Sequence, residues 1–147
     1  MAKTPLTASD YPIAETRPDE VIGTHGKPLS SVTMESVING DVCMEDLRIT
    51  PRALEQQAEI ATSVGRSALA SNLKRASEMT RLPQSEVMAI YELLRPGRAT
   101  SVENLLDAAN RVRTDYDAQL LGDFLDEAAS FYTVSYTHLT LPTTSKV

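Results

Sequence analysis

The stretch TPRALEQQAEIATSVG, residues 50–65, decides the fold class of this chain. Thr50 can cap a helix whose first position is Pro51, because a proline at that position loses no intrahelical hydrogen bond. Apolar side chains then recur at i, i+4 and i+7 and form one stripe until Gly65 interrupts it. The stripe consists of Leu54, Ala58 and Ala61. The sequence therefore predicts an amphipathic helix that ends at Gly65.

Three further helices are predicted on the C-terminal side. The second covers about residues 67–80 and should pair with the first as a helical hairpin, with Lys74, Arg75 and Glu78 turned outward. The third opens at Pro83 and ends at Pro96–Gly97. The last begins at a T-x-x-E capping box, Thr100 to Glu103, and continues to Tyr132. The apolar faces expected for the three are Leu69, Leu73 and Ala76; Val87, Ile90, Tyr91 and Leu94; and Leu105, Leu106, Ala109, Val112, Tyr116, Leu120, Phe124 and Ala128.

On the N-terminal side the sequence predicts less regular structure. Residues 1–30 contain several prolines and are expected to form an extended arm. We expect this arm to lie on another surface and to be flexible in the absence of that contact. Thr33 can cap a short helix through Asn39, with Val37 and Ile38 turned inward, and Gly40 can take the left-handed conformation that closes it. We predict an all-α fold of about four to five helices, with the arm at 1–30 and a helical domain at 31–132.

Residues 133–147 break with the helical pattern before them. The stretch VSYTHLTLPTTSKV, residues 134–147, is rich in threonine and contains no pattern typical of a helix cap or a turn that would explain the change. Residues 134–143 resemble the translation of an adapter used in transposase-based sequencing libraries. We therefore predict that 133–147 is adapter-derived rather than native, and we assign no function to Tyr136 or His138.

Composition and charge narrow the class of protein. A chain of 147 residues without tryptophan, in which aromatic residues make up 5%, favours one domain of helices packed through aliphatic side chains. The net charge of −6 disfavours general binding to nucleic acids or to anionic membranes. Because we find no stretch long and apolar enough for a signal peptide or a membrane span, we expect a cytoplasmic protein.

The residues that usually carry chemistry do not form a recognisable motif. Cys43 is the only cysteine, which excludes an internal disulfide, and we expect it to be a small buried side chain. His25 sits in a Gly-Thr-His-Gly turn without a nearby carboxylate, so we expect no base or ligand role. The pairs Glu45–Asp46 and Asp126–Glu127 are expected on solvated faces. We predict no catalytic, cofactor-binding or metal-binding residue on this chain.

One alternative comes from residues 75–91, whose spacing imitates a DNA-binding helix-turn-helix with its second helix near Pro83. Residues 65–98 hold six basic residues against three acidic ones. The leading end of the second helix, however, offers no lysine or arginine to contact phosphate or guanine. It presents Gln84, Ser85, Glu86 and Met88. Two packed structural helices are favoured, with a small DNA-binding regulator as the alternative and a generic helical adaptor as a third reading.

An ordered series of blocks resembles a known family. The blocks are Asp10-Tyr11-Pro12, Gly26-Lys-Pro-Leu29, Leu47-Arg-Ile-Thr-Pro51, Leu54-x-x-Gln57-Ala58-x-Ile60-Ala61 and Ile90-Tyr-x-x-Leu-Arg-Pro96. Together they resemble the small subunit of adenosylcobalamin-dependent diol and glycerol dehydratases over residues 10–132. No single block is specific, but their order and spacing are.

The resemblance implies a heterohexameric lyase that removes water from 1,2-diols or glycerol by a radical mechanism and yields an aldehyde. It implies that the large subunit holds the substrate, that adenosylcobalamin lies between large and medium subunits, and that the small subunit packs against the large one. None of these roles maps onto residues of this chain, whose arm would then be ordered by its partner. The preference for glycerol or propanediol stays open. So does association with a bacterial microcompartment, since some relatives carry a longer leader before the Asp10 block.

Overall fold

The computed structural model describes residues 4–95 and 101–139, with side chains described as far as residue 132. Within these ranges the regular structure is helical, apart from one isolated bridge between Ile22 and Pro28, and this confirms the predicted all-α class. The chain divides into two compact units, residues 1–80 and residues 81–147. The domain boundaries at residues 30 and 132 stay predictions.

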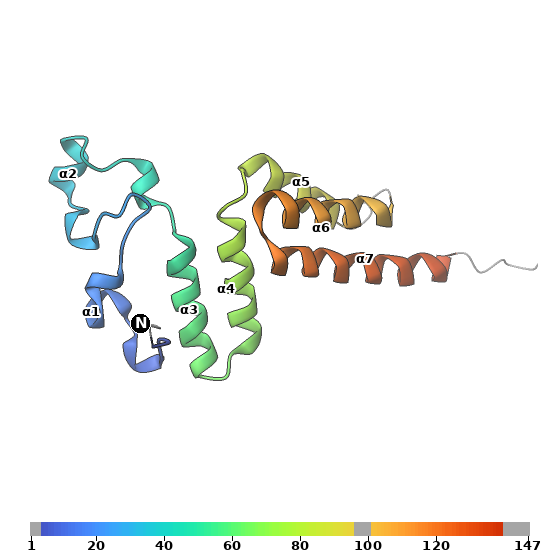
Figure 1. The fold of residues 1–147 in the computed structure, drawn as a ribbon, viewed down its shortest axis with the longest axis horizontal. Helices are drawn as coiled ribbons and strands as arrows, with labels where there is room; N and C mark the ends of the chain where they lie inside the picture. Colours follow the sequence, from blue (N-terminus) through green and yellow to red (C-terminus); the bar gives the residue numbers. More distant parts are fainter. Residues whose placement is uncertain (1–3, 96–100, 140–147) are drawn as a thin grey trace, which may run out of the picture. The chain divides into compact units, whose positions relative to one another are not determined.

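The first unit is built on the predicted hairpin of two long helices, which lie side by side and antiparallel (Figure 1). Its elements are η1 (Ala8–Asp10), α1 (Ile13–Thr16), η2 (Pro18–Glu20), η3 (Leu29–Ser31), α2 (Met34–Ile38), η4 (Met44–Leu47), α3 (Pro51–Ser63) and α4 (Ser67–Met79). Where α3 meets α4 the core consists of Ala58, Ala61 and Ala70, with Leu73 packed against them. These side chains are small, so the two helices can approach closely.

The predicted ends of α3 are confirmed. The Thr50 hydroxyl accepts a hydrogen bond of 3.1 Å from the backbone N–H of Ala53, and Pro51 occupies the first helical position. At the other end Gly65 has φ +74°, a left-handed conformation that a residue with a Cβ seldom adopts. Gly40, which has φ +79° after α2, plays the part predicted for it.

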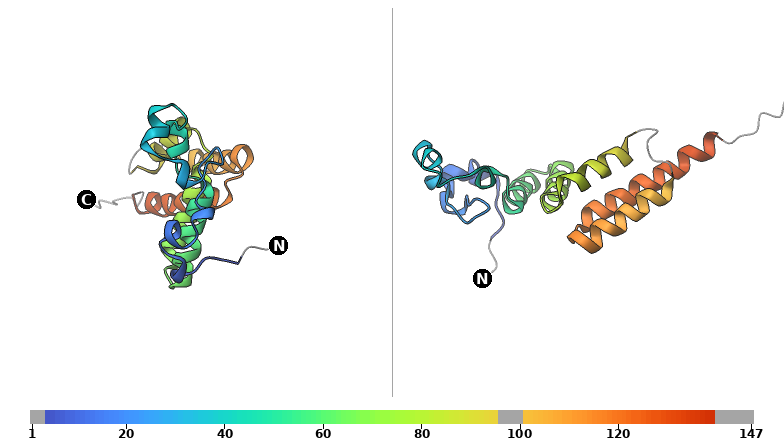
Figure 2. Two further views of the ribbon diagram at one scale, coloured as in Figure 1. Left: turned by 90° about the vertical axis from the view of Figure 1, so that its left-hand side faces the viewer. Right: turned by 90° about the horizontal axis from the view of Figure 1, so that it is seen from above.

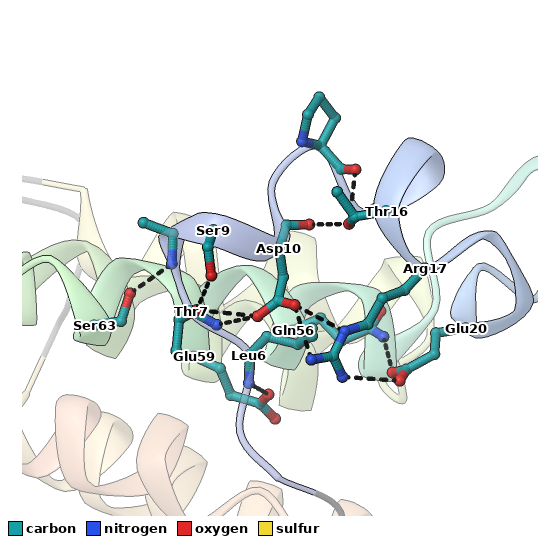
Figure 3. Close-up of polar contacts among 12 residues, drawn as sticks. Leu6, Thr7, Ser9, Asp10, Thr16, Arg17, Glu20, Gln56, Glu59 and Ser63 are labelled. Carbon is teal, nitrogen blue, oxygen red and sulfur yellow. Dashed lines mark hydrogen bonds and ion pairs between the residues drawn. The ribbon is translucent and has the colours of Figure 1, made fainter.

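The N-terminal segment differs from the expected extended arm. Much of it is folded into single helical turns, and η1 packs on α3. Figure 3 shows how it is fastened: the backbone N–H of Leu6 donates to Glu59 at 2.8 Å and that of Ala8 to Ser63 at 3.0 Å. The Leu6 side chain is buried. The segment therefore finds its partner groups within its own chain.

The carboxylate of Asp10 gives the N-terminal segment a predictable pH dependence. It accepts from the backbone N–H of Thr7 at 2.8 Å and from Arg17 Nε at 2.8 Å, and these contacts hold the pKa of Asp10 below its usual value. A depressed pKa stabilises the folded state above the unfolded-state value of about 3.9 and loses its effect as pH falls through the folded value.

We therefore expect Asp10→Asn to lower the thermal midpoint at pH 7 and to lose this difference from the parent as the pH is taken towards 3. Asp19→Asn, at an exposed carboxylate in the same segment, is the matched control. Thermal scans of the full chain across this range measure the effect. An Asp10→Asn difference that persists unchanged at low pH would contradict the assignment.

The second unit contains α5 (Gln84–Leu94), α6 (Val102–Tyr116) and α7 (Gln119–Leu139). Helix α5 starts after Pro83, as predicted, whereas Pro96, Gly97 and Thr100 lie outside the described residues. The cap of α6 is Ser101, whose hydroxyl accepts from the backbone N–H of Asn104 at 3.4 Å. Helices α6 and α7 form an antiparallel pair (Figures 1 and 2).

The prediction of one continuous helix to Tyr132 is wrong, because the chain turns at Asp117. This residue has φ 51°, and the next N–H, of Ala118, donates back to the carbonyl of Val112 at 3.1 Å. Such a left-handed closure ends a helix, and aspartate tolerates it better than most residues other than glycine. The turn shifts the buried face by one residue. Leu121, Leu125 and Ala129 are buried instead of the expected Leu120, Phe124 and Ala128.

The predicted orientations of five further residues on the helix faces are also wrong. Leu69 and Leu106 are substantially exposed, and so are Tyr91 and Leu94 on the expected buried side of α5. Glu78, expected to point outward, is buried. An apolar stripe is often wider than the neighbour that covers it, so its edge positions stay in solvent. In the part of the chain that the structure describes, none of the helices has the length and apolarity that crossing a membrane would need.

Gly122, in the first turns of α7, is expected to resist substitution. A Cβ built there lies 2.8 Å from Cγ and 2.6 Å from Nε of Arg113, whose guanidinium pairs with Asp123 at 2.7 Å and Asp126 at 2.6 Å. Gly122→Ala must therefore shift the Arg113 side chain, including Cγ near its base, and this strains its pairing with the two carboxylates. We expect a net loss of about 1–3 kcal/mol, because the overpacking outweighs the gain in helix propensity.

Urea unfolding of the full chain, followed by circular dichroism, measures this loss. The matched control is Ser130→Ala, an exposed position in the same helix, for which a change within about 0.5 kcal/mol is expected. A Gly122→Ala chain as stable as the parent would show that Arg113 moves aside freely.

Candidate functional site

The segment between residues 29 and 49 carries an unusual density of exposed apolar side chains. We call it the 29–49 segment; these side chains are 45–76% exposed, and α2 within it buries no residue. They are Leu29, Met34, Val37, Ile38, Met44, Leu47 and Ile49. The predicted inward orientation of Val37 and Ile38 is therefore wrong, because no neighbouring element in the described part of the chain covers this short helix. Single exposed apolar residues are ordinary, but such a concentration in one segment makes it the candidate surface for contact with another molecule.

A buried carboxylate holds the end of this segment in place. Asp46 in η4 is 5% exposed and accepts hydrogen bonds from three residues. Lys27 Nζ donates to Oδ2 at 2.8 Å, the backbone N–H of Cys43 donates to the same oxygen at 3.0 Å, and His25 Nδ1 lies 2.7 Å from Oδ1. Lys27 also donates to the backbone carbonyl of Asp41. Asp46 therefore joins the turn at residues 23–27 to the start of η4.

The surroundings of Asp46 strongly favour its ionised form. The Lys27 ammonium is the largest influence, followed by the Cys43 backbone N–H and the His25 ring, and together they hold the pKa of Asp46 well below its usual range. The same contact raises the pKa of Lys27. The loops on either side are thus joined by a charged pair at neutral pH.

Three sequence predictions about these residues are wrong. His25 does have a carboxylate beside it, Asp46 is buried rather than solvated, and Cys43 is exposed rather than buried. The physical reason is that the turn at 23–27 folds against η4, which brings residues about twenty positions apart into contact. Gly23 permits this close approach, because a Cβ there would meet the carbonyl oxygen of Asp46 at 3.0 Å.

A groove lies between the N-terminal segment and the start of α3. It has a volume of about 870 Å³, and its lining combines apolar groups such as Pro12 and Ile22 with charged ones such as Glu20 and Arg52. Gln56 also lines the groove, and its Nε2 donates a hydrogen bond of 3.1 Å to Oε2 of Glu20 (Figure 3). Across the described residues every buried side-chain nitrogen or oxygen has a hydrogen-bond partner.

Comparison with known proteins places this chain in a family of enzyme subunits. The family described as dehydratase small subunit matches residues 6–137, so the chain belongs to it. It is therefore the small subunit of a dehydratase made of several subunits, and the DNA-binding alternative is not supported. The match runs five residues past Tyr132, and the adapter origin of residues 133–147 stays a prediction.

Two relatives sharpen the comparison. The propanediol dehydratase small subunit of Salmonella typhimurium is 41% identical over 124 residues, which cover 84% of this chain and 71% of the relative. The propanediol dehydratase small subunit of Citrobacter freundii is 40% identical over 124 residues, covering 84% of this chain and 72% of the relative. Similarity of this extent covers both units.

Proposed function

We propose that this chain is the noncatalytic small subunit of an adenosylcobalamin-dependent diol dehydratase, which converts 1,2-propanediol or a related diol or glycerol into an aldehyde and water. The observation that carries the proposal is the 41% identity over 84% of the chain to a propanediol dehydratase small subunit. The reaction eliminates one water from the diol. The chain works in the cytoplasm, where a bacterial microcompartment is one setting for such an enzyme.

Adenosylcobalamin and the substrate bind to the partner subunits in this proposal. When bound there, the cofactor supplies the radical that starts the removal of water. The described residues of this chain do not fit an enclosed site for it, since their buried polar atoms are already paired with one another.

The contribution of this chain is to dock on the large subunit through the 29–49 segment. Its exposed side chains include Met34 and Ile38, each 76% exposed. Burying apolar surface of this kind stabilises association by roughly 25 cal/mol per Å² before the entropic costs of binding. Asp46 and Lys27 fix the part of the segment around η4 to the turn at residues 23–27, which reduces the entropy lost on docking.

Co-expression tests the proposal. The full chain is expressed with and without large and medium dehydratase subunits, and the products are examined by size exclusion and by cobalamin-dependent aldehyde formation from 1,2-propanediol. We expect the three chains to elute together and activity to fall when this chain is left out. Full assembly and full activity in its absence would overturn the proposed role.

A further inference from the structure

Three different metal-ligating side chains meet at the surface of the first unit. The potential ligand atoms of His25, Cys43 and Asp46 all lie within 4.8 Å of one another. His25 Nδ1 is 2.7 Å from Asp46 Oδ1, and Cys43 Sγ is 3.3 Å from Asp46 Oδ2. The proposed dehydratase role uses none of these atoms for chemistry, and no motif in the sequence indicates that they lie together.

The backbone that carries these side chains is fixed on both sides. In the turn, the N–H of Gly23 donates to the carbonyl of Lys27 at 2.8 Å, and the N–H of Gly26 donates to that of Gly23 at 3.0 Å. In η4, the N–H of Asp46 donates to the carbonyl of Cys43 at 3.1 Å. The ligands are thus presented by two braced segments rather than by free loops, and little ordering remains for a metal to impose.

We propose that His25, Cys43 and Asp46 bind a divalent transition-metal ion, with Zn²⁺ as the best match. An imidazole, a thiolate and a carboxylate are the ligand types that Zn²⁺ takes, whereas Mg²⁺ and Ca²⁺ take oxygen ligands. Three protein ligands leave the fourth tetrahedral position for a water molecule or for a side chain of another subunit. The site replaces the sequence-based expectation that this chain ligates no metal.

Binding requires a defined exchange of protons. The Cys43 thiol releases its proton to solvent. The His25 ring gives up to solvent the Nδ1 proton that it donates to Asp46 and takes one from solvent on Nε2, so that Nδ1 is free to ligate and one proton is released in all. The metal then replaces the two contacts that His25 and Cys43 make with the carboxylate. Ligand atoms around a tetrahedral Zn²⁺ are about 3.3–3.8 Å apart, given bond lengths of about 2.0–2.3 Å. His25 and Cys43 are exposed and can move outward to reach this spacing.

Lys27 determines which oxygen of Asp46 is available to the metal, and its charge affects which metal ions the site prefers. Its ammonium lies on Asp46 Oδ2, which leaves Oδ1 for the metal and orients the carboxylate, as the outer partners of metal ligands commonly do. The thiolate and the carboxylate together neutralise a divalent ion, so the Lys27 ammonium gives the occupied site a net charge of +1. Ions held by charge alone are disfavoured here, and ions that form strong bonds to thiolate are selected.

Cobalt(II) is the probe that tests this site in the purified full chain, without partner subunits or cobalamin. Because Cys43 is the only cysteine, a thiolate-to-cobalt charge-transfer band can come only from this residue. We expect such a band to saturate at one Co²⁺ per chain and to disappear when Zn²⁺ is added. Absence of the band at saturating Co²⁺ would overturn the proposal.

Substitutions at Cys43 and His25 test whether each residue ligates the metal. Cys43→Ser should abolish the band, and His25→Gln should weaken Co²⁺ binding at least tenfold. The chain has two histidines, so His138→Gln is the matched control and should bind as the parent does. Circular dichroism verifies that each variant keeps its helices. A His25→Gln chain that binds Co²⁺ as tightly as the parent would exclude His25 and with it the site, and neither result bears on assembly with the dehydratase.

Discussion

Replacing Leu105 with alanine is expected to destabilise the second unit by about 2–5 kcal/mol, the range for a fully buried leucine truncated to alanine. Leu105 in α6 is 1% exposed. The same core contains Ala108, Ala109 and Ala118, which are fully buried and have no rotamers with which to fill a cavity. The lost contacts are therefore not recovered by repacking. Urea unfolding followed by circular dichroism measures the loss, since the chain has no tryptophan to report it by fluorescence.

The neighbouring residue supplies the control for this prediction. Leu106 is 40% exposed, so Leu106→Ala makes the same chemical change on the same helix with much less burial. It should cost less than about 1 kcal/mol, as substitutions away from the core usually do. Equal losses at the two positions would show that the buried face of α6 is not the one described.

The parts of the fold that were predictable from sequence depend on local chemistry. The start of α3 at Thr50–Pro51 and its end at Gly65 are set by side-chain caps and by one left-handed residue, all within a few positions of each other. The α3–α4 hairpin follows from the short link between two amphipathic stretches. In each case the residues that decide the structure are adjacent in the chain.

The break at Asp117 was not predictable in the same way. Neither glycine nor proline marks it, and the apolar spacing continues through it with only a shift of one position. Leu120 and Leu121 are both leucines, so the sequence alone does not say which faces α6. The hairpin decides this, since closure at Asp117 turns Leu121 and Leu125 into the core.

The cluster around Asp46 was missed for a different reason. His25 and Lys27 reach Asp46 across 21 and 19 positions, and nothing in their spacing announces a contact. The folding of the turn at 23–27 against η4 creates the site. A search for motifs uses only local spacing and does not detect a buried charge that depends on tertiary contacts. For this reason Asp46 was predicted to lie on a solvated face.

The second large effect is expected in assembly, from aspartate substitutions in the 29–49 segment. Ile38 and Met44 are 76% and 73% exposed, so the double variant Ile38→Asp, Met44→Asp should leave the stability of the isolated chain close to that of the parent. In the proposed complex these side chains become buried, and a charge placed there is desolvated without a partner. A central interface residue is worth about 2 kcal/mol or more, so binding to the other subunits should weaken by at least about 30-fold.

Co-purification with the large and medium subunits and cobalamin-dependent aldehyde formation both report this loss. Val64→Asp is the matched control, because Val64 is also an exposed apolar residue of the first unit but lies outside the 29–49 segment. Loss of assembly in the double variant alone assigns docking to that segment, because both chains gain negative charge on exposed apolar positions. Equal loss in the control would instead trace the effect to net charge, and normal assembly of the double variant would show that the partner docks on another surface of this chain.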